Sequence, residues 1–152
     1  MIAEKTFNGA KIAVIAFADA ERPRWLRFLP KGFRHCFALV RSSGRWVVIN
    51  PMSHWTEVAA LAESADGATA DEMVRTLEER GLAAVVCAIA EPARRAWPFA
   101  PFTCVEVVKR ILGIQEPLVL TPWQLFRFLQ QNQLLEKNHS EMKIILDRGI
   151  NT

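Results

Sequence analysis

The sequence predicts an α+β domain in which an antiparallel sheet packs against a helix that begins at Cys104. Three observations support this fold class. Several short runs are rich in β-branched and apolar residues, which is typical of buried strands. Two of these runs, residues 33–41 and 45–50, are separated by a short segment that contains Gly44, and this is a hairpin signal. The helix at Cys104 has a capping signal at each end.

The length of 152 residues suits one compact domain, which we place at residues 1–131, with residues 132–152 as a C-terminal tail or helix. Hydrophobic residues make up 51% of the chain and charged residues 23%, as in ordinary globular proteins. The apolar runs are too short for a membrane span, and the N-terminus lacks the basic and apolar order of a signal peptide. Three irregularly spaced cysteines form neither a disulfide framework nor a metal-knuckle pattern, which favours a reducing compartment. We expect no metal and no cofactor.

The first half of the chain is expected to form most of the sheet. The expected elements are a strand at 11–18, an amphipathic helical turn at 24–29, and hairpin strands at 33–41 and 45–50 joined by Ser42, Ser43 and Gly44. Residues 56–62 fit either a helix or a strand, and we favour a strand. Alternation along the first hairpin strand places His35 and Cys36 on opposite faces. If the hairpin closes about Ser43, His35 lies across from Asn50 or Pro51.

The second half is expected to supply the helices and one more strand. Thr69 and Glu72 form a capping box for a helix at 70–80 that Gly81 stops. A buried strand at 82–90 and a proline-rich loop at 91–101 follow, and Cys87 in that strand is read as a core residue. Thr121 is expected to cap a helix that has Pro122 as its first residue and Gln124 as its third, and that runs to Gln131. Residues 140–148 form either a last helix or a tail.

The cysteine at position 104 is the strongest candidate for chemistry. Thr103 and Glu106 have the T-x-x-E spacing of a capping box, so Thr103 is the expected N-cap and Cys104 the first helical residue. Free backbone N–H groups and the positive end of the helix dipole stabilise a thiolate there. The apolar stripe expected to pack inward is Cys104, Val107, Val108, Ile111 and Leu112.

A cysteine hydrolase needs a thiolate, an imidazole within hydrogen-bond reach and a group that orients the ring. The histidines are His35 on the expected hairpin, His54 in the turn after it and His139 in the polar tail. We therefore predict Cys104 as the nucleophile, His35 as the general base and acid, and Asn50 as the orienting residue. The backbone N–H of Cys104 is expected to bind the oxyanion.

Two structural readings of these residues stay open beside the catalytic one. A cysteine on an apolar helix face is most often a core residue, and a histidine on a strand is most often a hydrogen-bonded structural group. A zinc site would need Cys104, His35 and either Cys36 or His54. Strand alternation argues against zinc because it separates His35 from Cys36.

A basic cluster interleaved with aromatic residues offers a binding alternative. Its members are Arg22, Arg24, Arg27, Lys31 and Arg34. Such a patch fits a phosphate-bearing or other polyanionic partner, but it also fits a solvated rim around a partly buried turn. The net charge of +3 argues against a dedicated nucleic-acid binder.

The order of these candidate residues resembles a known family. The segments Gly32-Phe33-Arg34-His35, then Asn50, then Phe102-Thr103-Cys104-Val105-Glu106 follow the order His, polar residue, Cys. This order is similar to the circularly permuted NlpC-like branch of the papain fold, whereas ordinary papain-like enzymes have the cysteine first. The segments GFRHCFALV, WVVINP, FTCVEVVKRILGI and TPWQLFRFL also resemble small proteins of bacteriophages and prophages.

The resemblance implies a papain-like domain with a Cys104, His35 and Asn50 site that hydrolyses or transfers an acyl group from an amide, ester or thioester. It implies a peptide or acyl substrate, such as a peptidoglycan peptide or a phage particle protein, and a location in the host cytoplasm or the virion. An alternative from the same resemblance is a phage structural or assembly protein that keeps the fold with an idle site.

Overall fold

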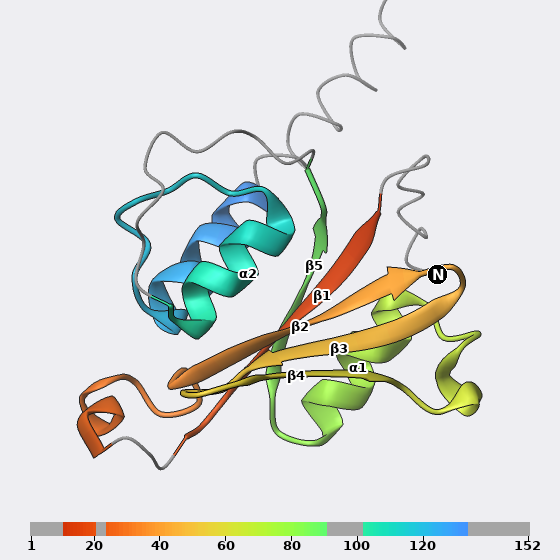
Figure 1. The fold of residues 1–152 in the computed structure, drawn as a ribbon, viewed down its shortest axis with the longest axis horizontal. Helices are drawn as coiled ribbons and strands as arrows, with labels where there is room; N and C mark the ends of the chain where they lie inside the picture. The colour runs from red at the N-terminus through yellow and green to blue at the C-terminus, as the bar shows by residue number, and fades with distance from the viewer. Residues whose placement is uncertain (1–10, 21–23, 91–101, 134–152) are drawn as a thin grey trace, which may run out of the picture.

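The computed structural model describes residues 11–20, 24–90 and 102–133, and these form an α+β fold with a five-stranded antiparallel sheet (Figure 1). The strands, all antiparallel to their neighbours, are β1 (Ile12–Ala18), β2 (His35–Ser42), β3 (Arg45–Pro51), β4 (Thr56–Ala60) and β5 (Ala83–Ala88). Their order across the sheet is β4-β3-β2-β1-β5. The helices are α1 (Ala70–Glu79), α2 (Cys104–Leu112), one at residues 122–133, and the short 3₁₀ turns η1 (Arg24–Phe28) and η2 (Glu63–Ala65).

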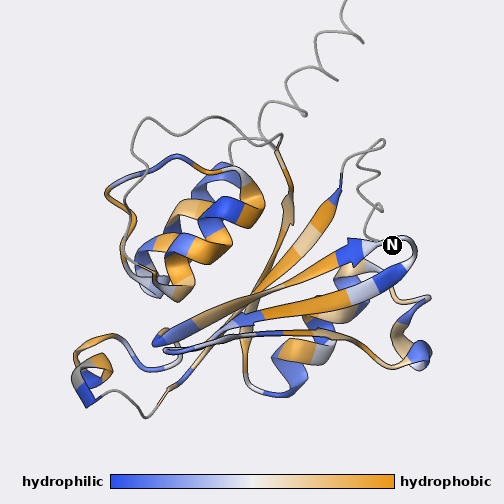
Figure 2. Cartoon of the chain, viewed as in Figure 1, coloured by the Kyte–Doolittle hydropathy of each residue, from blue (hydrophilic) through white to orange (hydrophobic). Residues whose placement is uncertain are grey.

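The central strand β1 is buried on both faces, as its uninterrupted apolar sequence predicts. On one face, Val14 and Ala16 join Trp46 of β3 in a core that Met73 and Leu77 of α1 cover. Val74 of α1 is partly buried and lies at the margin of this core. In Figure 2 hydrophobic colouring is prominent on the strands, while the exposed sides of α1 are hydrophilic.

The opposite face of the sheet carries α2 and the helix at residues 122–133, which lie beside each other in Figure 1. The residues that form this second core are Ala13, Ile15, Phe17, Cys36, Ala38, Val85, Val105, Val108, Leu112, Leu125 and Leu129. The expected inward stripe of α2 needs a correction: Val105 is buried although it lies outside that stripe, and Val107 and Ile111 are only half-buried. The α2 helix is therefore rotated so that one side of the stripe faces an open groove.

The hairpin turn is one residue shorter than predicted. Ser42 pairs with Arg45, so only Ser43 and Gly44 form the turn, and both have positive φ, 51° and 83°. Two such residues match the twist of the strands in a type I′ turn. Continuing this register places Asn50 opposite Phe37, so the prediction that His35 lies directly across from Asn50 or Pro51 was wrong by one to two residues. Asn50 is instead a diagonal neighbour of His35.

The helix ends follow their sequence signals closely. Thr69 and Glu72 form the full capping box of α1, and Gly113 ends α2 in the left-handed region at a φ of 73°. Thr121 and Gln124 exchange hydrogen bonds at the start of the helix at residues 122–133. The described part of this helix extends beyond the expected end at Gln131, so the proposed boundary at 131 falls inside a helix.

Several expectations concern residues that lie outside the described ranges. These are the N-terminal residues, Arg22 of the basic cluster, the loop at 91–101, His139 and the last helix at 140–148. Within the described ranges, no helix is both long enough and apolar enough to cross a membrane.

Candidate active site

The first turn of α2 holds the Cys104 thiol. The Thr103 side chain accepts a hydrogen bond from the backbone N–H of Glu106 at 3.1 Å, and this makes Thr103 the N-cap. Cys104 is the first residue of the helix, where its own N–H has no acceptor within the helix. The sequence prediction of a capped helix that begins at Cys104 is confirmed. Its thiol is half-buried against the second core.

The hairpin holds the imidazole. Nε2 of His35, at the start of β2, lies 2.7 Å from Oδ1 of Asn50 on β3. An amide oxygen only accepts hydrogen bonds, so this contact requires a proton on Nε2. The other ring nitrogen, Nδ1, is then available to exchange a proton with a reacting group. The predicted pairing of His35 with Asn50 is present in the structure.

Glu57 on β4 is a further member of this network that the sequence did not reveal. Asn50 Nδ2 donates to Glu57 Oε2 at 3.2 Å, and the two residues are cross-strand partners. Because a carboxylate only accepts, this bond holds the amide nitrogen toward β4 and the amide oxygen toward His35. Pairing residues 45–50 with residues 56–62 in the sequence would have placed Glu57 opposite Asn50.

Cys36 is the second residue that sequence reasoning had not assigned to the site. It is fully buried in the second core, on β2 beside His35. A hydrogen bond to Cys104, together with burial, raises the pKa of the Cys36 thiol well above 9.0. Cys36 therefore stays protonated and serves as a hydrogen-bond donor to Cys104. Strand alternation places His35 and Cys36 on opposite faces of β2, yet both residues interact with the sulfur of Cys104.

These contacts stabilise the Cys104 thiolate. The hydrogen bond from the Cys36 thiol has the largest effect and lowers the pKa of Cys104, whereas burial raises that pKa. Hydrogen bonds to His35 and to the Cys36 backbone lower it further, and so does the charge of His35. Together they lower the pKa of Cys104 from 9.0 to about 4. Burial lowers the pKa of His35, but its hydrogen bonds to Cys104 and Asn50 outweigh this and raise it above 6.5. Between these two pKa values the pair is a thiolate and an imidazolium.

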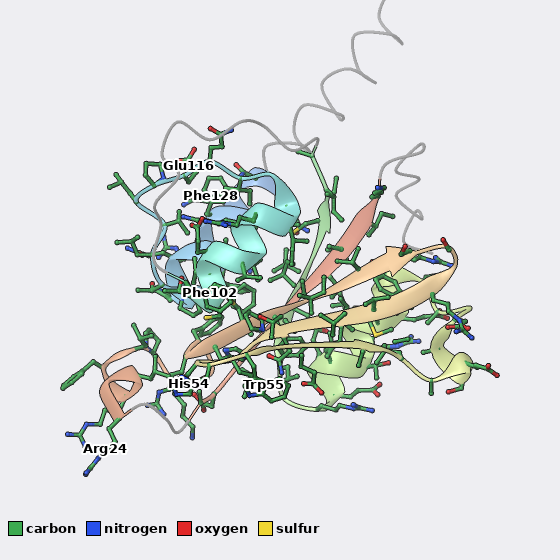
Figure 3. The ribbon with its side chains drawn as sticks, in the orientation of Figure 1. Arg24, His54, Trp55, Phe102, Glu116 and Phe128 are labelled. Carbon is green, nitrogen blue, oxygen red and sulfur yellow. The ribbon has the colours of Figure 1, made fainter. Side chains whose placement is uncertain are left out.

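The remaining cysteine and histidine candidates lie elsewhere. Cys87 on β5 packs at the edge of the second core, as predicted for a core residue. Figure 3 shows His54 in the turn between β3 and β4. No group of three His, Cys, Asp or Glu side chains is placed to hold a metal ion in the part of the chain that the structure describes.

In the described part of the basic cluster, some side chains are exposed and others contact neighbouring residues. Arg24 and Lys31 are exposed, and the Arg27 guanidinium lies 5.8 Å from the Phe28 ring centroid. Arg34 pairs with Asp19 at 3.7 Å and donates to the carbonyl of Leu29 at 3.5 Å. Arg34 therefore has a structural role in joining the end of β1 to the segment after η1.

The orienting role of Asn50 leads to a mutational prediction. Asn50→Ala removes a hydrogen bond that raises the pKa of His35, so that pKa should fall and the imidazolium should be lost at lower pH. We expect acylation of Cys104 to slow by about 10- to 100-fold, as for loss of a hydrogen bond to a charged group. The measurement is the rate of Cys104 acylation by an activated ester across pH. Glu57→Gln keeps an acceptor for Asn50 and should cost less than Glu57→Ala; equal rates in all four proteins would contradict the orienting role.

The chain was compared with protein-family models, with curated proteins and with solved structures. No match was found in any of the three comparisons. A functional proposal therefore depends on the α+β architecture and on the arrangement of Cys104, His35 and Asn50.

Proposed function

We propose that the protein is a thiol hydrolase or acyltransferase that acts on an amide or ester bond through Cys104, His35 and Asn50. The observation that carries the proposal is the arrangement of these residues: Cys104 begins a capped helix and interacts with His35, whose Nε2 lies 2.7 Å from Oδ1 of Asn50. These contacts lower the pKa of the Cys104 thiol to about 4. Perturbed pKa values in a nucleophile and its partner are typical of catalytic sites. A cysteine buried for packing alone would have a raised pKa instead.

In the proposed reaction the Cys104 sulfur attacks the carbonyl carbon and forms a C–S bond. The carbonyl electrons move to oxygen, and the backbone N–H of Cys104 at the helix N-terminus stabilises the resulting oxyanion. When the oxyanion collapses, the bond to the leaving amine or alkoxide breaks and His35 Nδ1 donates its proton to that group. Water or an acceptor amine or alcohol then attacks the acyl-enzyme, gives a proton to His35 and releases the thiolate.

We further propose that the fold is a papain-like domain of the permuted NlpC-like type. Support comes from the order His35, Asn50, Cys104 and from a cysteine-bearing helix that packs on an antiparallel sheet. A peptide of the cell wall or of a phage particle is the substrate that this family membership implies. A phage structural protein with an idle site remains the alternative within the same fold.

Trapping the acyl-enzyme tests the function. The protein is mixed with p-nitrophenyl acetate, quenched in acid and mapped by peptide mass spectrometry. We expect release of p-nitrophenol with repeated turnover and one acetyl group on the peptide that contains Cys104. Acetylation spread evenly over Cys104 and Cys87, or none, would overturn the proposed activity and favour the idle-site alternative.

A further inference from the structure

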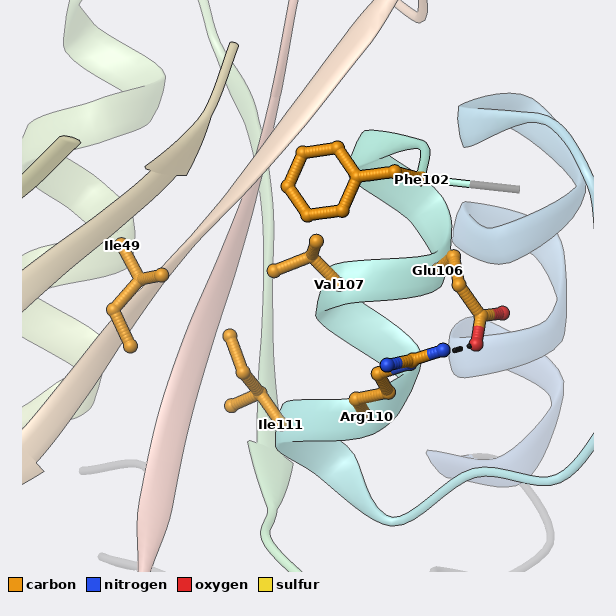
Figure 4. A pocket seen from close by; sticks show the side chains of 6 residues that line it. All are labelled: Ile49, Phe102, Glu106, Val107, Arg110 and Ile111. Carbon is orange, nitrogen blue, oxygen red and sulfur yellow. Dashed lines mark hydrogen bonds and ion pairs between the residues drawn. The ribbon is translucent and has the colours of Figure 1, made fainter. Parts of the chain in front are cut away.

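A groove runs beside the nucleophile, between α2 and β3 (Figure 4). Its volume is about 390 Å³, within the size range of small-molecule sites. The residues that line it are Ile49, Phe102, Glu106, Val107, Arg110 and Ile111. Figure 4 shows Phe102, Val107 and Ile111 on the side of α2 that faces Ile49. One wall of the groove is thus a helix and the other a strand.

The groove lies along the first turns of α2, the helix that begins at Cys104. Phe102 precedes Cys104 by two residues, and Val107 lies three residues after Cys104, on the same side of α2. On the opposite wall, Ile49 precedes Asn50 on β3, and strand alternation points these two side chains to opposite faces of the sheet. A group that occupies the groove therefore lies beside the turn of α2 that carries Cys104.

The apolar surface around the groove is exposed rather than packed. The exposed fraction of Phe102 is 66%, although it lies on the groove wall. Val58 of β4, the cross-strand partner of Ile49, is also 66% exposed, and cross-strand partners lie on the same face of a sheet. Neighbouring exposed apolar residues beside a groove indicate a site for an apolar ligand.

The groove also presents an accessible guanidinium, that of Arg110. The Glu106 carboxylate is 6% exposed and pairs with both Lys109, at 3.2 Å, and Arg110, at 3.0 Å. Lys109 is buried and also donates to the carbonyls of Glu116 and Val119. One carboxylate thus faces two cations, and the more accessible of these is Arg110, whose side chain is 53% exposed. A guanidinium in this position suits a carboxylate on the ligand.

We propose that the groove is the acyl-binding subsite of the enzyme, and that it takes an apolar acyl chain that ends in a carboxylate bound by Arg110. This inference rests on the proposed function. The acyl group is the part of a substrate that stays attached to Cys104 until the second attack, so it is the part that needs a fixed binding site. The leaving group must depart before water or an acceptor can enter.

The test uses p-nitrophenyl esters that share one leaving group and differ in the acyl chain: acetate, hexanoate and the monoester of adipic acid. We expect kcat/KM to be about tenfold higher for hexanoate than for acetate, because part of the added chain is buried. Adipate should exceed hexanoate by a further five- to tenfold, since Arg110 binds its carboxylate.

Matched variants assign these preferences to the groove. Phe102→Ala should lower the hexanoate-to-acetate ratio several-fold, whereas Leu118→Ala, which removes an 81% exposed residue after α2, should leave it unchanged. Arg110→Gln should abolish the preference for adipate over hexanoate, and Arg75→Gln on α1 should not. Circular dichroism confirms that each variant is folded.

The outcomes separate the groove from the proposed activity. Turnover of all three esters at equal rates would overturn the subsite and leave the activity standing, whereas no turnover of any ester would overturn the activity itself. A preference for hexanoate that persists in Phe102→Ala would contradict the subsite, and so would a dimer that Phe102→Ala dissociates in size-exclusion chromatography. A lack of preference for adipate would overturn the role of Arg110.

Discussion

Replacing Cys104 with serine is expected to lower kcat/KM for an activated ester by about 10⁴-fold or more, as removal of other catalytic nucleophiles does. The wild-type thiol is ionised above about pH 4, so the nucleophile is present at neutral pH without a base. A serine hydroxyl has no comparable ionisation, although it keeps the size of the side chain and the N-cap geometry. The measurement is steady-state hydrolysis of p-nitrophenyl acetate at pH 7.

Cys87→Ser is the matched control, because it makes the same substitution at a half-buried cysteine on β5. We expect this variant to keep wild-type kcat/KM, with thermal melting used to show that both variants are folded. If Cys104→Ser were as active as wild type, Cys104 would not be the nucleophile, and the thiol would have to be read as a core residue.

Replacing His35 with alanine should have the second largest effect, a loss of about 10²- to 10⁴-fold in kcat/KM, which is the usual contribution of a general acid–base group. The imidazolium donates the proton to the leaving group, and its hydrogen bond and charge also lower the pKa of Cys104. The variant should therefore lose rate and show a higher Cys104 pKa. The rate is measured by ester hydrolysis, and the pKa of Cys104 is measured from the pH dependence of its alkylation.

His54→Ala serves as the control, since His54 lies in the exposed turn between β3 and β4. Added imidazole should restore part of the activity of His35→Ala and none of that of Cys104→Ser. Retention of full activity in His35→Ala, or equal losses in His35→Ala and His54→Ala, would contradict the assignment of His35 as the general acid and base.

Local signals in the sequence predicted the start and end of the helix that carries Cys104. Thr103 and Gly113 bond to backbone groups within one helical turn, so the start and end of α2 depend on residues that are adjacent in the chain. The capping box of Thr69 and Glu72 is confirmed for the same reason. Such contacts need no knowledge of how distant segments pack.

Residues that act through strand pairing were harder to predict. Ser43 adopts a positive φ that only a minority of non-glycine residues take, and this shortens the turn and shifts the register of Asn50. The contribution of Glu57 depends on the pairing of β3 with β4, which no local signal in residues 45–60 specifies. Although the predicted register was wrong, the side chains of His35 and Asn50 are long enough to form a hydrogen bond between diagonal positions.

The role of Cys36 lay beyond a reading of strand alternation. Alternation places Cys36 on the opposite face of β2 from His35, but it does not say which face α2 covers or which residue of α2 lies above Cys36. That depends on the rotation of α2, which buries Val105 and Val108 and turns Val107 toward the groove. Helix rotation is set by side-chain packing between elements far apart in the chain, so it requires the structure.

The most direct test of the central claim is the pH dependence of Cys104 alkylation by iodoacetamide, followed by peptide mapping. The pKa of about 4 predicts that the rate rises through pH 4 and is already near its plateau at neutral pH. Buried Cys36, whose pKa is raised well above 9.0, should remain unlabelled over this range. An alkylation rate for Cys104 that instead rises only near pH 9 would show an ordinary thiol and would contradict a thiolate–imidazolium site.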